Sequence, residues 1–163
     1  MVFNLSLMTG VFPECWKNSF IFPIHKKGCE RTVTKYRGIA SLSSVSKLFE
    51  IVILEKLTHD CSHIISLDQH GFMPKRSTTT NLITFTSFIT REIERGHQVD
   101  AIYTDLSAAF DKVNLEIALA KYDKIGINDN LLIWLRSYLT GRTMSVKLGD
   151  FISSPFCVTS GVP

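Results

Sequence analysis

The sequence is short of the features that mark several special classes of protein. It contains four cysteines in 163 residues, at Cys15, Cys29, Cys61 and Cys157, and no two of them form a C-x-x-C pair. This irregular spacing argues against a zinc ribbon and against a disulfide framework. It is typical of reduced thiols, so we expect an intracellular protein, of the cytoplasm and nucleus.

Long apolar runs are missing as well. The longest, such as Ile51 to Leu54, fall far short of the roughly 20 residues that a membrane helix needs. The first eight residues lack the basic start of a signal peptide. No membrane partner is therefore expected. The composition, 45% hydrophobic and 20% charged, excludes a disordered chain and indicates a globular domain.

Charge of one sign is only mildly in excess. The net charge is +3, which alone is weak support for a nucleic-acid partner. The cations, however, gather at predicted loops, where a phosphate backbone can reach them. The clusters are Lys26-Lys27, Lys35 with Arg37, Lys75-Arg76, and Arg142 with Lys147. For any single cluster, ordinary solvated loop charge is the alternative.

Apolar periodicity and turn residues predict an α+β fold without repeats. A strand over 19–24 should lie at an edge or bend, because it contains Pro23. Residues 26–40 and 68–76 read as loops, 99–105 as a strand, and 144–158 as a hairpin. Helices are expected over 43–58, over 77–95, from 114 to 124, and from Asn128 or Asp129 to Gly141.

Caps and apolar stripes give these helices more detail. Ser77 and Asn114 should cap two of them, and Gly96 should end the helix that Ser77 begins. Two stripes should be buried. They are Val45, Leu48, Phe49, Val52 and Leu57 in the helix over 43–58, and Leu82, Phe85, Ile89 and Ile93 in the helix over 77–95.

The run from Asp100 to Val113 carries the clearest chemical signal. An apolar strand ends at Asp105, and a tight turn with Phe110 follows. A polymerase palm needs a carboxylate on a rigid strand to hold Mg²⁺, here with the Leu106 carbonyl, and a bulky ring beside the sugar of the nucleotide. Mn²⁺ is the alternative ion. Taken alone, Asp105 also fits the cap of a short helix, and Phe110 fits plain core packing.

Three other segments carry residues suited to phosphate or base contacts. Lys26, Lys27 and Arg37 lie on glycine-containing loops that can close over a triphosphate. The segment 69–78 places an aromatic ring and two cations ahead of a helix N-terminus, which suits a phosphate, although an ordinary capped loop is the alternative. The closing turn, Ser160-Gly161 before a proline, suits close backbone approach to a base pair.

In order and content these motifs resemble the reverse transcriptases of non-LTR (LINE-type, jockey-like) retrotransposons. The resemblance covers nearly the whole chain from about Val11. Five motifs in order make it specific, so a structural domain with accidental motifs is disfavoured. The matching runs are 16–28, 36–42, 47–50, 69–72, 76–78, 105–113, 137–142 and 160–163.

The resemblance implies a right-hand polymerase fold, with fingers over 1–97 and the first part of the palm over 98–163. It also implies DNA synthesis from dNTP on an RNA template and a DNA primer, with two Mg²⁺ ions. By motif position Asp105 is the catalytic metal ligand, assisted by Leu106, and Phe110 is the sugar gate. Lys26 or Lys27 and Arg37 match the triphosphate contacts, Gln69, Gly71 and Arg76 the template side, and Ser160 and Gly161 the nascent pair.

The sequence departs from the family at three places. Arg37-Gly38-Ile39-Ala40 replaces Arg-Pro-Ile-Ser, which should loosen the loop that aims Arg37, and Ala108 replaces a lysine. The Asp-Asp motif is not reached, and a single carboxylate cannot cage two Mg²⁺ ions. We therefore expect a fragment that is inactive alone. A non-catalytic nucleic-acid-binding remnant is the alternative.

Overall fold

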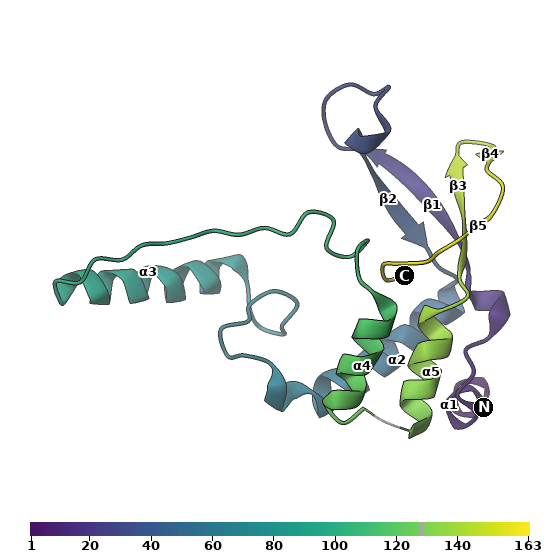
Figure 1. Cartoon of the computed structure of the whole chain (residues 1–163), viewed down its shortest axis with the longest axis horizontal. Coiled ribbons are helices and arrows are strands. Elements are labelled where there is room, and N and C mark those ends of the chain that lie inside the picture. The colour runs from purple at the N-terminus through teal and green to yellow at the C-terminus, as the bar shows by residue number, and fades with distance from the viewer. Residues whose placement is uncertain (128) are drawn as a thin grey trace. The chain divides into compact units, whose positions relative to one another are not determined.

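The computed structural model describes residues 1–127 and 129–163, and it divides into two compact units. Unit 1 consists of Met1–Lys56 and Ala108–Pro163, and unit 2 of Leu57–Ser107. Each unit is described by itself. This division does not follow the boundary expected near residue 97, and the assignment to fingers and palm stays a prediction. The mixture of helices and sheet agrees with the α+β class (Figure 1).

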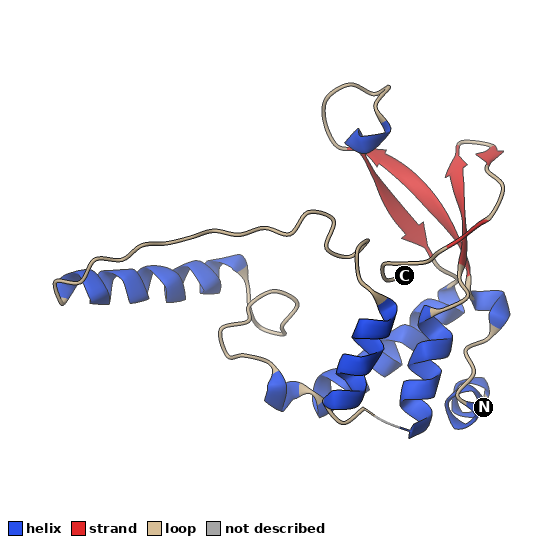
Figure 2. Cartoon of the chain, in the orientation of Figure 1, coloured by secondary structure: helices blue, strands red, loops and turns tan. Residues whose placement is uncertain are grey.

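All the strands of the described residues belong to unit 1, where they form one sheet (Figure 2). Strand β1 (Asn18–His25) lies between β2 (Tyr36–Ser41), which is antiparallel to it, and β3 (Thr143–Leu148), which is parallel. The short strands β4 (Phe151–Ile152) and β5 (Phe156–Cys157) both pair with β3. The hairpin predicted over 144–158 is confirmed, with a return strand that is broken in the middle.

The strand predicted over 19–24 is confirmed. Of its two expected forms, an edge strand or a bent strand, the structure excludes the edge strand. Strand β1 pairs on both sides, and the sheet tolerates its proline because the two ladders differ in length. Pairing with β3 ends at Ile21, whereas Pro23 pairs only with Gly38 of β2. The missing N–H of Pro23 therefore costs the sheet no hydrogen bond to β3.

The prediction of a loop over 26–40 is wrong in its second half, where residues 36–40 belong to strand β2. The N–H of Lys26 donates to the carbonyl of Lys35 at 2.9 Å, after the short 3-10 helix Val33–Lys35. The ring of Tyr36 lies 5.2 Å from that of His25, its partner in the ladder, and its hydroxyl donates to the carbonyl of Glu30. Pairing with β1 creates this strand, and a polar local composition does not reveal it.

The predicted helices are confirmed, with bounds that differ by a few residues. They are α2 (Ser44–Asp60), α3 (Thr78–Glu94), α4 (Leu115–Lys124) and α5 (Asp129–Leu139), and the chain adds α1 (Val2–Thr9) and the 3-10 helices Glu14–Trp16 and Ser62–Ile64. The Asn114 side chain accepts from the N–H of Ile117 at 3.1 Å, as its predicted role as cap requires. The alternative start at Asn128 lies outside the described residues.

The core of unit 1 is built from aromatic rings. Phe12 and Phe49 are fully buried, and both pack against Trp134, at ring distances of 5.6 and 4.9 Å. Helix α2 contributes Phe49 as predicted, but Val45, Leu48 and Val52 of the predicted stripe are about half exposed. Ile53 is buried in their place, because the i, i+4 pair with Phe49 faces the rings.

Unit 2 contains the loop 65–76 and helix α3. Ser77 and Thr80 form a capping box at its start, and Gly96 follows its end with φ +78°, so the predicted cap and stop are confirmed. The predicted buried stripe is wrong: Leu82 and Ile93 are about 60% exposed, and Phe85 and Ile89 are half-buried. A helical stripe becomes core only where another element covers it, and of this stripe Phe85 contacts the ring of Tyr103 at 6.0 Å.

The strand predicted over 99–105 is also wrong. These residues have no regular secondary structure and are nearly all exposed, because no strand of the described residues pairs with them. A strand needs a partner for its N–H and carbonyl groups. The helix considered as the alternative does not form either, since residues 107–112 make turns. No helix in the described part of the chain has the length and apolar character needed to cross a membrane.

Candidate functional site

Two of the predicted site motifs meet in unit 1. The N–H groups of Gly161 and Val162 donate to the carbonyls of Val113 and Phe110, at 2.9 and 3.2 Å. The hydroxyl of Ser160 donates to the carbonyl of Asp111 at 3.1 Å, across 49 positions of sequence. The turn that carries Phe110 is thus fixed by the closing Ser160-Gly161 motif.

Gly161 makes this contact possible. Its backbone has φ +84°, a conformation that side chains with a Cβ rarely adopt. A Cβ there would lie 3.1 Å from both the Cα of Asp111 and the carbonyl oxygen of Phe110, which are backbone atoms that cannot easily move aside. Only glycine therefore allows the two segments to approach this closely.

The ring of Phe110 is not part of the core. It is 61% exposed, so the alternative of plain core packing is wrong. Asp111, expected to hold the turn, takes part through its backbone carbonyl, which accepts from Ser160. Ala108 adopts φ +53° and tightens the same turn. An exposed ring on a fixed turn is able to discriminate between ligands by shape.

The basic residues of the first predicted motif lie on the β1–β2 hairpin. Lys26 and Lys27 directly follow β1, Arg37 lies in β2 opposite Ile24, and all three are exposed. Within residues 1–127 and 129–163, none of the three side chains has a hydrogen-bond or ion-pair partner. These cations therefore keep their full capacity to contact phosphate.

The backbone around Arg37 is not the loosened loop that we expected. The run Arg37-Gly38-Ile39-Ala40 lies in a paired strand and not in a loop. A Cβ on Gly38 would approach the Cγ2 of Ile21 to 2.8 Å, so glycine fills a position of close contact. The backbone that aims Arg37 is fixed by the ladder.

The predicted template-side residues hold their own loop in unit 2. The Gln69 side chain donates to the carbonyl of Gly71 at 2.9 Å. The guanidinium of Arg76 donates to the carbonyls of Leu67 and Gln69. At the end of this loop Phe72 adopts φ +61° and is 93% exposed. The geometry gives Gln69 and Arg76 a structural use, while Phe72 presents its ring to solvent.

Asp105 belongs to unit 2 and Phe110 to unit 1, so each is described in its own unit. Asp105 is exposed, and so are its neighbours Ile102, Tyr103 and Leu106, by 79 to 88%. The Asp105 carboxylate and the Leu106 carbonyl offer two oxygen ligands. This suits one Mg²⁺ ion that also takes water and phosphate oxygens. No three His, Cys, Asp or Glu side chains gather into a metal site in the described part of the chain.

The sequence placed Arg142, with Lys147, among the loop cations that a phosphate backbone can reach. For Arg142 this prediction is wrong, because the residue is 1% exposed. Its guanidinium lies over the rings of Tyr138 and Phe12, at 5.2 and 5.9 Å, and donates to the Tyr138 carbonyl. The Tyr138 hydroxyl donates to Glu50 at 2.9 Å. Burial raises the pKa of Tyr138, helped by the Glu50 charge, and burial lowers the pKa of Arg142. The matching runs 47–50 and 137–142 were the sequence signals of this network.

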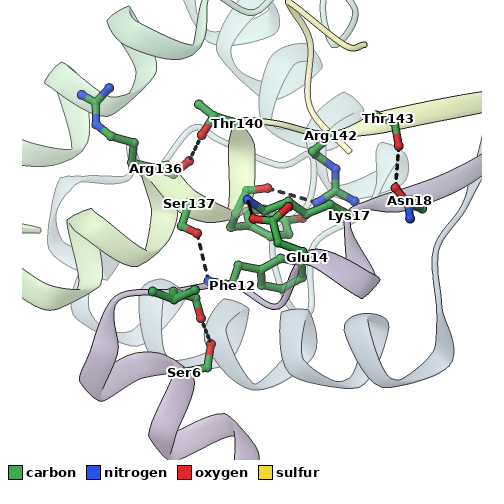
Figure 3. A network of polar contacts seen from close by, with 12 residues as sticks. Ser6, Phe12, Glu14, Lys17, Asn18, Arg136, Ser137, Thr140, Arg142 and Thr143 are labelled. Carbon is green, nitrogen blue, oxygen red and sulfur yellow. Dashed lines mark hydrogen bonds and ion pairs between the residues drawn. The ribbon is translucent and has the colours of Figure 1, made fainter. Parts of the chain in front are cut away.

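Polar contacts around Arg142 join the N-terminal segment to α5 and β3 (Figure 3). The Ser137 hydroxyl accepts from the N–H of Phe12 at 2.9 Å. Lys17, itself 6% exposed, pairs with Glu14 at 2.7 Å, and its carbonyl accepts from the N–H of Thr143. These contacts fix the start of β3 against β1.

Comparison with known proteins gives one consistent result. Residues 24–163 match the family described as reverse transcriptase (RNA-dependent DNA polymerase). The chain is 31% identical over 166 residues to the RNA-directed DNA polymerase from mobile element jockey of Drosophila melanogaster. It is equally similar to the probable RNA-directed DNA polymerases from transposon BS and from transposon X-element of the same organism. Each match covers 100% of this chain and 18% of the relative's length.

Proposed function

Because the chain belongs to the reverse transcriptase (RNA-dependent DNA polymerase) family, with relatives in jockey-like mobile elements, we propose that it forms the nucleotide-selecting part of a retrotransposon polymerase. That polymerase extends a DNA primer along an RNA template with dNTP, inside the cell. The observation that carries the proposal is the contact between the Ser160-Gly161 motif and the Phe110 turn.

Phe110 is proposed to select the sugar of the incoming nucleotide. Three hydrogen bonds between its turn and residues 160–162 hold the backbone of the turn, and the ring is exposed. A ring in this position excludes the extra 2′-hydroxyl of a ribonucleotide and leaves room for a deoxynucleotide. The smaller side chain in Phe110→Val should therefore weaken the preference for dNTP over NTP; an unchanged preference would remove the gate role.

Asp105 and the Leu106 carbonyl are proposed as ligands of a divalent ion, Mg²⁺ or Mn²⁺. When bound with a triphosphate, such an ion neutralises charge on the phosphates. The exposed position of Asp105 on an extended segment leaves its carboxylate open to the ion and its water. Fingers over 1–97 and the first part of the palm over 98–163 remain the proposed division of the right-hand fold.

The cations of the β1–β2 hairpin are proposed to bind phosphate, either the triphosphate or the template backbone. Binding of an RNA template–DNA primer duplex should then weaken steeply with salt. Replacing Lys27 and Arg37 by glutamine should reduce the slope of log K against log salt by about 0.7–0.9 for each phosphate that the protein no longer neutralises. The matched control is Lys121→Gln with Lys124→Gln, which removes two exposed charges from α4. Equal effects of both pairs would contradict a specific contact.

A second candidate function is that of a non-catalytic nucleic-acid-binding remnant, which the exposed cations of the β1–β2 hairpin would equally serve. The purified chain should give no primer extension on RNA with dNTP and Mg²⁺, because the proposed ligands, Asp105 and the Leu106 carbonyl, hold one ion, whereas the reaction uses two. Robust synthesis would refute the argument from the incomplete site. A remnant would bind the duplex without any preference for dNTP, whereas the proposed function requires that preference.

A further inference from the structure

Two of the matching sequence runs have no role in the proposed function, and they meet inside unit 1. The runs 47–50 and 137–142 join where the Tyr138 hydroxyl donates to Glu50 at 2.9 Å. Arg142 completes the network by donating to the Tyr138 carbonyl at 3.1 Å. The network thus connects helix α2 with the end of α5 and the start of β3.

Stability alone does not explain an arginine at this position. The side chain is 1% exposed, and its Nε and Nη2 atoms have no hydrogen-bond partner among the described residues. The rings of Phe12 and Tyr138 compensate part of the charge, and Glu50 is the nearest carboxylate in the network. A well-packed apolar side chain generally fills such a site at lower cost than a buried cation. The arginine therefore calls for an explanation beyond packing.

The backbone of Arg142 leads directly to the candidate site. Its carbonyl accepts from the N–H of Val158 at 3.0 Å, next to the pair formed by Thr143 of β3 and Cys157 of β5. Two residues after Val158 the chain reaches Ser160 and then Gly161, which bond to the Phe110 turn. A side chain that fixes the backbone at Arg142 thus fixes the start of the docking segment.

We propose that Arg142 is a positioning residue for nucleotide selection: the Glu50–Tyr138–Arg142 network anchors β5, and β5 holds the Ser160-Gly161 motif against the Phe110 turn. This inference rests on the proposed function of Phe110. Its first part, the mechanical link from Arg142 to Gly161, is independent of any activity and can be tested on the chain itself.

The link is tested by hydrogen exchange of individual backbone amides. In Arg142→Met, which keeps the volume between the rings but loses the charged donor, the amides of Val158, Gly161 and Val162 should exchange about tenfold faster. The amide of Lys26, which closes the β1–β2 hairpin in the same unit, should keep its rate. This pattern separates positioning from a general loss of stability, which would accelerate all these amides together.

Three further variants sharpen the test. Tyr138→Phe removes only the hydroxyl that donates to Glu50, keeps both rings, and should loosen residues 158–162 more weakly. Arg142→Lys keeps the charge over the rings but not the planar donor. Its amides at 158–162 should therefore be better protected than those of Arg142→Met, and less well than those of the wild type. Arg136→Met is the matched control, because Arg136 lies on α5 with Tyr138 but its side chain is 54% exposed and pairs with Glu116. It should change none of the amides.

Unchanged exchange at Gly161 and Val162 in both Arg142→Met and Tyr138→Phe would overturn the proposal. A uniform rise in all amides would overturn it too, since Arg142 would then be merely structural. If Arg142→Met does not fold, Tyr138→Phe and Arg142→Lys decide by the same readout, because each removes less.

Binding of dNTP and NTP to the chain on an RNA template–DNA primer, with Mg²⁺, tests the second part. In each variant, the ratio of dNTP affinity to NTP affinity should fall by about the same factor by which the exchange of Gly161 and Val162 rises. Faster exchange with an unchanged preference would overturn the role in selection. A wild-type chain that shows no preference would instead contradict the proposed function, because the exchange result does not depend on it.

Discussion

Replacing Gly161 by alanine perturbs the contact on which the candidate site depends. Position 161 has φ +84°, and a Cβ there would meet the backbone of Phe110 and Asp111 at 3.1 Å. Neither neighbour is the end of a flexible side chain, so the docking segment itself has to withdraw. The expected effect is local, since the core around Phe12 and Phe49 is not touched.

The magnitude follows from three contributions. An alanine in the left-handed region costs about 1 kcal/mol relative to glycine. Withdrawal also weakens the hydrogen bonds donated by Gly161 and Val162, each contributing about 1 kcal/mol. Together the docked state of residues 160–162 should lose about 3 kcal/mol, which corresponds to roughly a 100-fold gain in local opening.

Amide hydrogen exchange measures this opening directly. In Gly161→Ala the protection of the Val162 amide should fall by roughly 100-fold or disappear, while amides of the β1–β2 ladder keep their protection. Gly149→Ala is the matched control: this glycine has φ +58°, but no atom lies within 4 Å of the added Cβ. It carries the backbone strain alone and should leave Val162 unchanged.

Full protection of Val162 in Gly161→Ala would refute the reasoning. It would mean that the segment 160–162 does not depend on the close approach to Phe110 and Asp111. A loss of protection that is equal in Gly149→Ala would refute it as well, because strain in the hairpin would then explain the result.

The remaining predictions concern stability. A hydrogen bond to His97, and secondly one to Arg91, lowers the pKa of Glu92 in the folded protein. The ionised Glu92 therefore stabilises the fold fully at pH values above the pKa that Glu92 has in the unfolded chain, and this stabilisation is lost as pH falls through its folded-state pKa. NMR titration should show this lowered value, and His97→Ala should raise it. Phe12→Ala should cost about 3–5 kcal/mol in the free energy of unfolding, measured with denaturant, because the ring is fully buried. Asn114→Ala should cost about 1 kcal/mol and speed exchange in the first turn of α4, whereas an effect below a few tenths would contradict the cap.

Local signals in the sequence predicted the helices well. Ser77 and Asn114 cap through contacts with residues three positions away, and Gly96 adopts the positive φ that ends α3. Such contacts form within one turn, so a pattern in the sequence is sufficient to specify them.

Features that depend on a distant partner could not be predicted in the same way. Strand β2 exists because it pairs with β1, and the segment 99–105 stays irregular because no described strand pairs with it. The same holds for burial, since the stripe of α3 is apolar but uncovered within its unit. Hydrophobic periodicity and composition describe a single segment, whereas strand pairing and burial depend on a second segment that contacts it.

The candidate site shows both cases. Sequence motifs identified Phe110 and Gly161 separately, but the hydrogen bonds that join their segments span 48 to 52 positions and become visible only in the structure. In the sequence, Arg142 beside Lys147 was read as a loop cation open to phosphate, because a local pattern does not show burial. Its burial between two rings identifies it as part of a network.

The central claim, that this chain carries the nucleotide-selecting part of a reverse transcriptase, is tested most directly by nucleotide binding. The measurement is the affinity of the complementary dNTP for the chain on an RNA template–DNA primer, with and without Mg²⁺, in wild type and in Asp105→Ala. The account predicts binding that requires Mg²⁺, prefers dNTP over NTP, and is lost in Asp105→Ala while the duplex still binds. Affinity that is indifferent to Mg²⁺, to the sugar or to Asp105 would contradict it.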